Sequence, residues 1–458
     1  MKKIMLLLTL VMIGLTACYT TYYNYNLQND YTSYIEIEYE NYETDEDYEI
    51  DNYEDEYNDY YDEEILTSFE DDAIAFIELI ESTHPIFVMP EFLADDYYDR
   101  RDEFIRAVKD AESQMDFNFA LQRFDTVLRD GHTSIRGFAL LSNYYLDMTF
   151  VADDNSLFLA DSEVVLEIME IGGVPTATVL ETIDRYFYYE NEVARNLAHA
   201  VMGRGMEILI RAGVEFEYDI TTLTLDNGEM RKVQAVEDNA WLIKGFVAAA
   251  DREFIIDYGM ITDDVFLIDL RAFIPGAHIN SAENAIRRAM DDGVRHFVFD
   301  VRNNTGGNAA VGAWLLDAMG ITPPSFGSVV RSRSALNPDQ EIASLISPSL
   351  RPTRNPYDVT IAVLTNANTL SSARWVSAWV QDGELGVIIG EPGANAPTAF
   401  GNVAAQITLP HSGMHIASST NRWIRPDAYA DQNTIWPDIY VPYSEALEAA
   451  LEFFAGLD

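Results

Sequence analysis

Ser371 stands at a turn between a predicted strand and a predicted helix, where a serine can act as a nucleophile. The apolar run from Val359 to Leu364 predicts a buried strand, and the polar residues Thr365 to Thr369 end it. A helical pattern then begins at Ser371, with Trp375 and Trp379 on one face. The first N–H groups of that helix could stabilise the oxyanion of an acyl-transfer reaction. The alternative is that Ser371 only caps the helix, since serine is favoured at this position.

His132 is the candidate general base for this serine. Of the seven histidines in the chain, it alone lies in a glycine-containing turn with hydroxyls and a carboxylate, Asp130-Gly131-His132-Thr133. Imidazole is the group that most often accepts a serine proton near neutral pH. The alternative is a structural histidine that only supports its own loop, and the residues alone leave both interpretations open.

A glycine pair supplies candidate donors for an oxyanion hole. The loop from Asp300 to Gly307 follows a predicted buried strand and precedes a predicted helix. Gly306 and Gly307 let the backbone approach a ligand closely and turn N–H groups toward it. The backbone N–H of Ser372, next to the nucleophile, is the second candidate donor. A phosphate-binding loop is the rival interpretation, but no lysine of the P-loop type follows the glycines.

Four segments resemble motifs of the C-terminal processing (tail-specific) and tricorn-core-like serine peptidases, in the same order along the chain. Asp300 to Gly307 is similar to the signature D-x-R-x-N-x-G-G, and Asn366 to Ala373 resembles the nucleophile turn. Ile389 to Pro392 is similar to the segment that follows that turn, and Trp436 to Val441 resembles the closing motif. The resemblance covers Ile65 to Phe454. It implies a crotonase-like α/β core with a mixed sheet, and hydrolysis of polypeptides without a metal or an organic cofactor.

The branch of the resembled family decides which residues act with Ser371. In the processing-protease branch the base is a lysine further along the chain, but no lysine occurs here after Lys244. The tricorn-like branch uses a histidine from an Asp-Gly-His-Thr-like loop and a late carboxylate, so the resemblance implies His132 as the base. Asp431 lies near the position of that branch's acid, and Glu391 is the alternative.

Arg374 departs from the resembled family, which usually carries a glutamate at this position. We interpret the arginine as a structural difference within a subgroup, and the chain as a serine peptidase. The alternative is a catalytically inactive relative that binds a peptide or another ligand at the cell surface.

The order of patterns along the chain predicts five regions. After the signal-like N-terminus, the chain shows first low complexity, then helical periodicity, then mixed patterns and finally an alternation of strands and helices. The predicted regions are a signal peptide at 1–17, an acidic tyrosine-rich tether at 18–64, a helical domain at 65–136, an accessory α+β domain at 137–250 and an α/β catalytic core at 251–458.

The N-terminus predicts export and a lipid anchor. Lys2-Lys3 precede an apolar run from Ile4 to Leu15, as in a secretory signal. The sequence Leu15-Thr16-Ala17-Cys18 resembles a bacterial lipobox, and Cys18 is the only cysteine, so no disulfide can form within one molecule. We therefore expect an extracytoplasmic protein that is held to the bacterial cell membrane by a lipid on Cys18.

Charge and composition narrow the range of partners. The 458 residues carry a formal net charge of -47, which argues against binding nucleic acid through a basic face. Residues 19–64 hold seventeen of the acidic residues and thirteen of the 26 tyrosines, with no Lys or Arg. Such a segment repels itself and predicts a disordered spacer. The sequence leaves the oligomeric state open.

The lipid anchor gives the first testable prediction. Cys18→Ala should leave the protein without a lipid, because no other thiol exists to accept one. The variant should be released to the medium or retained as the precursor. Metabolic labelling with a fatty-acid analogue measures this, and equal labelling of the wild type and the variant would contradict the anchor.

Overall fold

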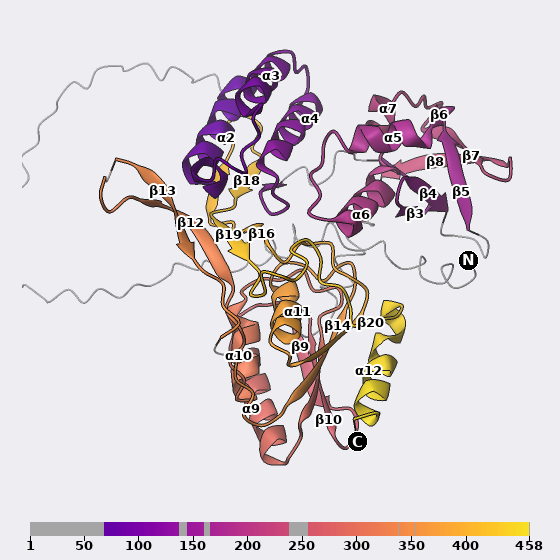
Figure 1. Ribbon diagram of the computed structural model, residues 1–458. Coiled ribbons are helices and arrows are strands. Elements are labelled where there is room, and N and C mark those ends of the chain that lie inside the picture. Colours follow the sequence, from indigo (N-terminus) through magenta and orange to yellow (C-terminus); the bar gives the residue numbers. More distant parts are fainter. Residues whose placement is uncertain are drawn as a thin grey trace, which may run out of the picture.

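The computed structural model describes residues 68–136, 144–159, 165–237, 255–337, 339–351 and 353–457 (Figure 1). The predicted signal peptide, Cys18 and the predicted tether lie outside these residues. Within the described ranges, no helix combines the length and the apolar character that crossing a membrane requires.

The α/β core is built around a six-stranded sheet with the strand order β20-β15-β14-β11-β10-β9. Neighbouring strands run parallel, except that β9 and β10 are antiparallel, so the sheet is mixed. The predicted α/β class with a mixed sheet is therefore confirmed. The strands are β9 (Ile256–Met260), β10 (Val265–Leu270), β11 (His296–Asp300), β14 (Thr360–Thr365), β15 (Gly386–Gly390) and β20 (Ile439–Tyr440).

Helices cover both faces of this sheet. Phe297 and Phe299 of β11 pack in one buried cluster with three helices, α9, α10 and α11. Val298, which points to the opposite face, packs with α12 on the other side (Figure 1). Because both faces are buried, the central strands are continuous apolar runs without alternation. The helices are α9 (Ala277–Asp291), α10 (Ala310–Ala318), α11 (Ser372–Asp382) and α12 (Ala446–Ala455).

The N-terminal helices pack on a small sheet made by distant parts of the chain. Ser68 and Asp71 form a capping box that starts the first helix, α2. The buried Asp72 carboxylate accepts the N–H groups of His411 and Ser412, which lie between two strands of the small sheet. The elements are α2 (Phe69–Thr83), η1 (Pro85–Val88), α3 (Tyr97–Lys109), α4 (Gln114–Asp125), η2 (Thr126–Leu128), β1 (Ser134–Arg136), β17 (Ala405–Thr408) and β18 (His415–Ser418).

An α+β unit follows, with a seven-stranded sheet in the order β2-β8-β7-β5-β4-β3 and β6 paired to β5. Its helices α5, α6 and α7 pack with this sheet around one apolar cluster. The elements are β2 (Tyr144–Leu146), β3 (Phe150–Asp153), β4 (Ser156–Leu159), β5 (Leu166–Ile171), β6 (Val174–Pro175), α5 (Thr176–Ile183), α6 (Glu192–Met202), α7 (Met206–Arg211), β7 (Ile220–Leu225) and β8 (Met230–Glu237).

A four-stranded antiparallel sheet, β13-β12-β19-β16, completes the described fold. The β12–β13 hairpin extends away from the core beside α2 (Figure 1). A short helical turn, η3 (Tyr443–Glu445), leads into α12. The strands are β12 (Gly327–Arg333), β13 (Glu341–Ile346), β16 (Ala399–Gly401) and β19 (Asn421–Ile424).

A buried ion pair fastens the segment after β19 to the end of α11. Nε and Nη2 of Arg425 donate to the Asp382 carboxylate at 2.9 and 2.6 Å, and the two side chains are 2% and 1% exposed. Nη1 of Arg425 also donates to the backbone oxygen of Asp431 at 2.8 Å. The pair therefore fixes the path of the chain that leads toward β20.

Breaking this pair gives a prediction about stability. Arg425→Met should lower the free energy of unfolding by about 3–5 kcal/mol, because it leaves the Asp382 charge buried and unpaired. Arg123→Met is the matched control, since Arg123 pairs with Glu103 at the surface, where such a pair contributes about 0–1 kcal/mol. Urea unfolding followed by tryptophan fluorescence measures both variants. If Arg425→Met and Arg123→Met lowered the free energy of unfolding by similar amounts, burial would not explain the effect.

Candidate active site

Ser371 occupies a strained position between β14 and α11. Its φ and ψ are 50° and −120°, an unusual backbone conformation for a residue that is not glycine. It stands at the N-cap of α11, yet its side chain makes no capping hydrogen bond. Its N–H donates to Oδ1 of Asn395 at 2.9 Å. The hydroxyl is therefore not used for capping, which argues against the interpretation of Ser371 as a cap alone.

Side chains of the two neighbouring loops hold this turn in place. Oδ1 of Asn366 accepts the N–H of Asn303 at 3.0 Å, and the Thr369 hydroxyl donates to the backbone oxygen of Val301 at 2.9 Å. The Leu370 N–H donates to the backbone oxygen of Asn304 at 2.9 Å. The loop after β11 and the loop after β14 therefore form one hydrogen-bonded unit.

Gly306 lies against the Ser371 turn, and Gly307 lies against Phe273. A Cβ on Gly306 would lie 2.6 Å from the Ser371 Cβ and 2.8 Å from the Ser372 nitrogen. A Cβ on Gly307 would lie 2.5 Å from the backbone oxygen of Phe273. Both glycines have positive φ, 100° and 130°. No other residue fits at these two positions without displacing the turn.

The backbone N–H groups near Ser371 differ in whether they already have a hydrogen-bond acceptor. The Gly306 N–H donates to Oδ1 of Asn304 at 2.8 Å, so it is occupied. Among the described residues, neither the Gly307 N–H nor the Ser372 N–H has a hydrogen-bond partner. The Ser372 hydroxyl donates to the backbone oxygen of Gly307 at 2.6 Å and holds the two residues together. Gly307 and Ser372 therefore have free donors beside the serine.

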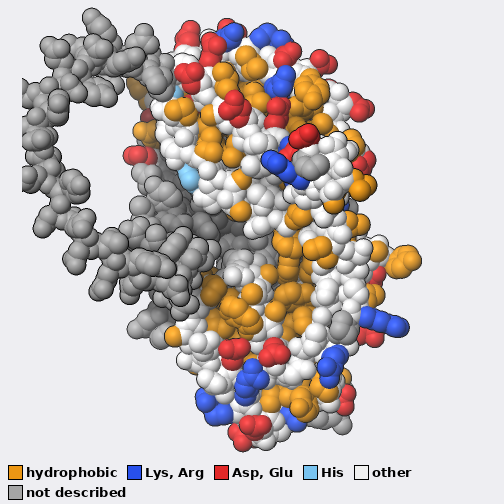
Figure 2. Space-filling model, turned by 90° about the vertical axis from the view of Figure 1, so that its left-hand side faces the viewer, with side chains coloured by type: hydrophobic (Ala, Val, Ile, Leu, Met, Phe, Trp, Pro, Cys, Tyr) orange, Lys and Arg blue, Asp and Glu red, His pale blue; other side chains and the backbone are white. Residues whose placement is uncertain are grey.

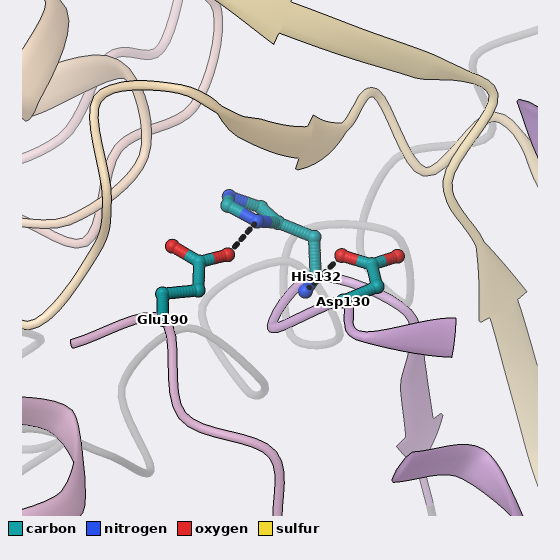
Figure 3. A group of neighbouring side chains, drawn as sticks. All are labelled: Asp130, His132 and Glu190. Atoms are coloured by element: carbon teal, nitrogen blue, oxygen red, sulfur yellow. Dashed lines mark hydrogen bonds and ion pairs between the residues drawn. The ribbon is translucent and has the colours of Figure 1, made fainter. Parts of the chain in front are cut away.

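The loop that carries His132 is organised around the buried carboxylate of Asp130. Oδ1 of Asp130 accepts the His132 N–H at 2.8 Å (Figure 3). Oδ2 accepts the Thr133 hydroxyl at 2.6 Å. Oδ2 also lies 3.2 Å from Nε2 of His84, which is buried beneath it. Burial alone would raise the pKa of Asp130, but His84, His132 and Thr133 hold it well below its ordinary value. The carboxylate is therefore ionised and fixes the backbone of His132.

Glu190 supplies the carboxylate beside the His132 ring. Oε1 of Glu190 lies 3.4 Å from Nδ1 of His132, and the side chains are 5% and 13% exposed (Figure 3). Oε2 accepts the Ala396 N–H at 2.7 Å and lies 3.4 Å from Nη1 of Arg374. Burial pushes the Glu190 pKa up, but His132, Arg374 and the Ala396 N–H together bring it below its ordinary value. The other ring nitrogen, Nε2, faces away from Glu190 (Figure 3).

Glu190 was missed by the sequence reasoning because it belongs to no motif. It lies in the link between α5 and α6, 58 positions after His132 in the chain. Gly131 shows why it can approach, since a Cβ there would lie 2.8 Å from Oε1 of Glu190. The glycine before His132 was the one signal in the sequence that another group comes close at this point.

Comparison with known proteins places the core in a family. Residues 264–441 match the sequence profile described as Peptidase family S41. This part of the chain is a peptidase family S41 domain. The chain is accordingly a serine-type peptidase, and no curated protein matches its sequence.

Solved structures share the fold of this S41 peptidase. Mature CPAF is 15% identical with a TM-score of 0.55, and the match covers 84% of this chain and 96% of that one. The structure of mature CPAF complexed with lactacystin is 14% identical with a TM-score of 0.53, covering 85% and 98%. At such identities the likeness concerns the fold.

The two carboxylates that the sequence suggested as the acid of the S41 peptidase lie elsewhere. Asp431 is engaged in its own turn, where it accepts the N–H of Asn433 at 2.8 Å and the indole N–H of Trp436 at 3.0 Å. Glu391 accepts the Tyr443 N–H at 3.3 Å, and burial raises its pKa to about 7. The structure thus places Glu190, rather than Asp431 or Glu391, next to His132.

A metal ion fits this group of side chains poorly. Single ligand atoms of Asp130, His132 and Glu190 lie within 4.8 Å of one another, which is close enough to hold an ion. Both oxygens of Asp130, however, already accept hydrogen bonds from its own loop. Binding an ion would break the contacts that hold His132 in place, so the group is better explained as a histidine between two supporting carboxylates.

Arg374 gives a prediction about the acid. Arg374→Ala should raise the pKa of Glu190, because it removes the positive charge beside that carboxylate. On the acidic limb of the pH profile, each unit of that rise lowers kcat/KM about tenfold. Because the ionised carboxylate is the useful form, the acidic limb of the pH profile should move to higher pH. Arg374→Lys should restore part of the loss and of the shift. A variant that loses activity with an unchanged pH profile would show that Arg374 has only a packing role.

Proposed function

We propose that this S41 peptidase cleaves polypeptides with Ser371 as the nucleophile, His132 as the general base and Glu190 as the acid that orients the imidazole. Glu190 replaces Asp431 in the arrangement suggested by the sequence. The observation that carries the proposal is the buried contact between Nδ1 of His132 and Glu190. A carboxylate on Nδ1 favours the tautomer with its proton there, which leaves Nε2 as an acceptor for a serine proton.

The reaction would follow the serine-peptidase sequence in two halves. The Ser371 Oγ attacks the peptide carbonyl carbon while its proton moves to Nε2 of His132. His132 then gives this proton to the leaving amine as the C–N bond breaks, and an acyl-enzyme remains. A water molecule, deprotonated by the same nitrogen, hydrolyses the ester and restores the serine.

The oxyanion would bind to the N–H groups of Gly307 and Ser372. Both lie beside Ser371 and neither has another partner in the described part of the chain. Losing one such donor costs about 2.7–4 kcal/mol of transition-state stabilisation in serine peptidases. The Gly306 N–H is a weaker candidate because Asn304 already holds it.

One loop connects the proposed nucleophile with the proposed base. The Ser371 N–H donates to Asn395, and the next residue, Ala396, donates to Glu190, which contacts His132. Arg374, three residues after Ser371, contacts the same carboxylate. These links support a common site. They also give the arginine a role in an active site, which weighs against the alternative of an inactive binding protein.

We also propose that the peptidase acts outside the cytoplasm, attached to the bacterial cell membrane by a lipid on Cys18. The signal-like N-terminus and the lipobox-like sequence support this location. The acidic segment at 18–64 would then act as a spacer between the membrane and the folded part, and the substrate would be a polypeptide.

Substitution of the three proposed groups tests the mechanism. Ser371→Ala and His132→Ala should each lower kcat by roughly 10⁴-fold or more, and the double variant should lose little further, because the pair acts as a unit. Glu190→Gln should lower kcat by up to about 10⁴-fold. Steady-state hydrolysis of a peptide library, together with labelling by an active-site serine probe, measures these effects.

Two controls make the result specific. Glu391→Gln is the matched control for Glu190→Gln, and His415→Ala is the control for His132→Ala. Both should keep most of the wild-type kcat. If Asp431→Asn abolished activity while Glu190→Gln did not, the acid would be wrongly assigned. If the wild type neither cleaved peptides nor reacted with the probe, the proposed function would fail.

A further inference from the structure

A cavity of about 600 Å³ lies between the start of α6 and the chain segments that follow β15 and precede β20. It is distinct from the Ser371 turn but borders it through Glu190, which lines the cavity and contacts His132. Its other lining residues come from the α+β unit and from the core. They are Asp153, Asn191, Glu192, Val193, Asn196, Pro392, Asn433, Thr434, Trp436 and Tyr440.

We propose that this cavity binds the cationic side chain of a lysine or an arginine in the polypeptide substrate. The inference rests on the proposed function, since it assigns a substrate preference to that site. Three observations support this proposal. They are the charge of the lining, the aromatic side chains in it, and the position of the cavity next to Glu190, which contacts the proposed base His132.

The lining is negatively charged and has no basic residue. The charge of Glu190 is balanced by Arg374, so Asp153 and Glu192 carry the remaining charge. Within the described residues neither of these two carboxylates forms an ion pair. The positive end of α6 offsets part of the Glu192 charge, because this residue is in the first turn. Asp153 is therefore the principal counter-ion for a cation.

Two half-exposed aromatic side chains line the same space. Trp436 and Tyr440 are each 54% exposed although they line a cavity. The Asp431 carboxylate accepts the Trp436 indole N–H at 3.0 Å and so fixes the orientation of its ring. A cation over a tryptophan or tyrosine face gains about 0.5–2 kcal/mol. Asp431, which does not contact His132, would thus support the cavity.

The lining also contains a hydrogen-bond acceptor that is not in use. Oδ1 of Asn196 is buried and has no partner among the described residues. The amide nitrogen of Asn191 is already used, because it donates to the backbone oxygens of Gly393 and Asn433. A ligand with N–H donors therefore satisfies this lining, whereas an apolar side chain would leave the carboxylates desolvated without a partner.

Long-range charge favours the same class of substrate. The chain carries a formal net charge of -47, so its field attracts basic polypeptides and repels acidic ones. The cavity would convert this general attraction into a preference for one basic residue near the bond that is cleaved.

Matched peptides test the preference. In a set of otherwise neutral peptides, a single lysine is moved through the positions on both sides of the cleaved bond, and norleucine of the same length replaces it in the control set. At one position kcat/KM should be roughly 5–30-fold higher with lysine, which is the effect of about 1–2 kcal/mol of binding. Asp153→Asn and Trp436→Ala should lower this ratio, whereas Asp292→Asn, an exposed residue outside the cavity, should leave it unchanged.

A binding measurement separates this inference from the proposed mechanism. Calorimetry with the Ser371→Ala variant should show tighter binding of the lysine peptide than of the norleucine peptide, lost in Ser371→Ala/Asp153→Asn. If that preference appears but the wild type cleaves no peptide, the catalytic proposal fails and the cavity assignment stands. Equal cleavage and equal binding of the two peptides at every position would overturn the cavity assignment. A lysine preference that Asp153→Asn leaves unchanged would also overturn it.

Discussion

The buried carboxylate of Glu190 joins every part of the proposed site. An ionised carboxylate loses several kcal/mol of solvation when it is buried, so it needs compensating partners. Its three partners come from three separate segments: the loop with His132, the first turn of α11 with Arg374, and the segment after β15 with Ala396. Glu190 itself belongs to the α+β unit. The position of that unit against the core therefore decides whether Nδ1 of His132 has a carboxylate beside it.

The register of the central sheet brings the other groups together. Asp300 of β11 pairs with Leu364 of β14, which in turn pairs with Ile389 of β15, so the three parallel strands end at the same edge. The loops that follow them carry the glycine pair, Ser371 and Asn395, respectively. Sites of open α/β sheets gather beyond the carboxyl ends of the strands for this reason. Hydrogen bonds between these loops then fix the positions of the loops relative to one another.

Local patterns predicted those parts of the fold and site that depend on neighbours in the sequence. The apolar runs identified the central strands, and Gly306 of the glycine pair lies beside Ser371. Groups that meet only through tertiary packing gave no such pattern. Glu190 lies in an ordinary link between helices, and the extended β12–β13 hairpin has few buried side chains to mark it. Asp431 was a reasonable candidate by position, yet its turn directs it to Trp436.

Arg374 connects the local sequence with this tertiary arrangement. A glutamate, which the resembled family usually has at this position, would put a second negative charge beside Glu190 and raise its pKa. The arginine does the opposite, because it is buried and lies 3.4 Å from the Glu190 carboxylate. It is also on α11, the helix that begins directly after Ser371. The positive charge at this position of α11 therefore complements the carboxylate that the α+β unit supplies, and it helps that carboxylate to stay ionised beside the imidazole.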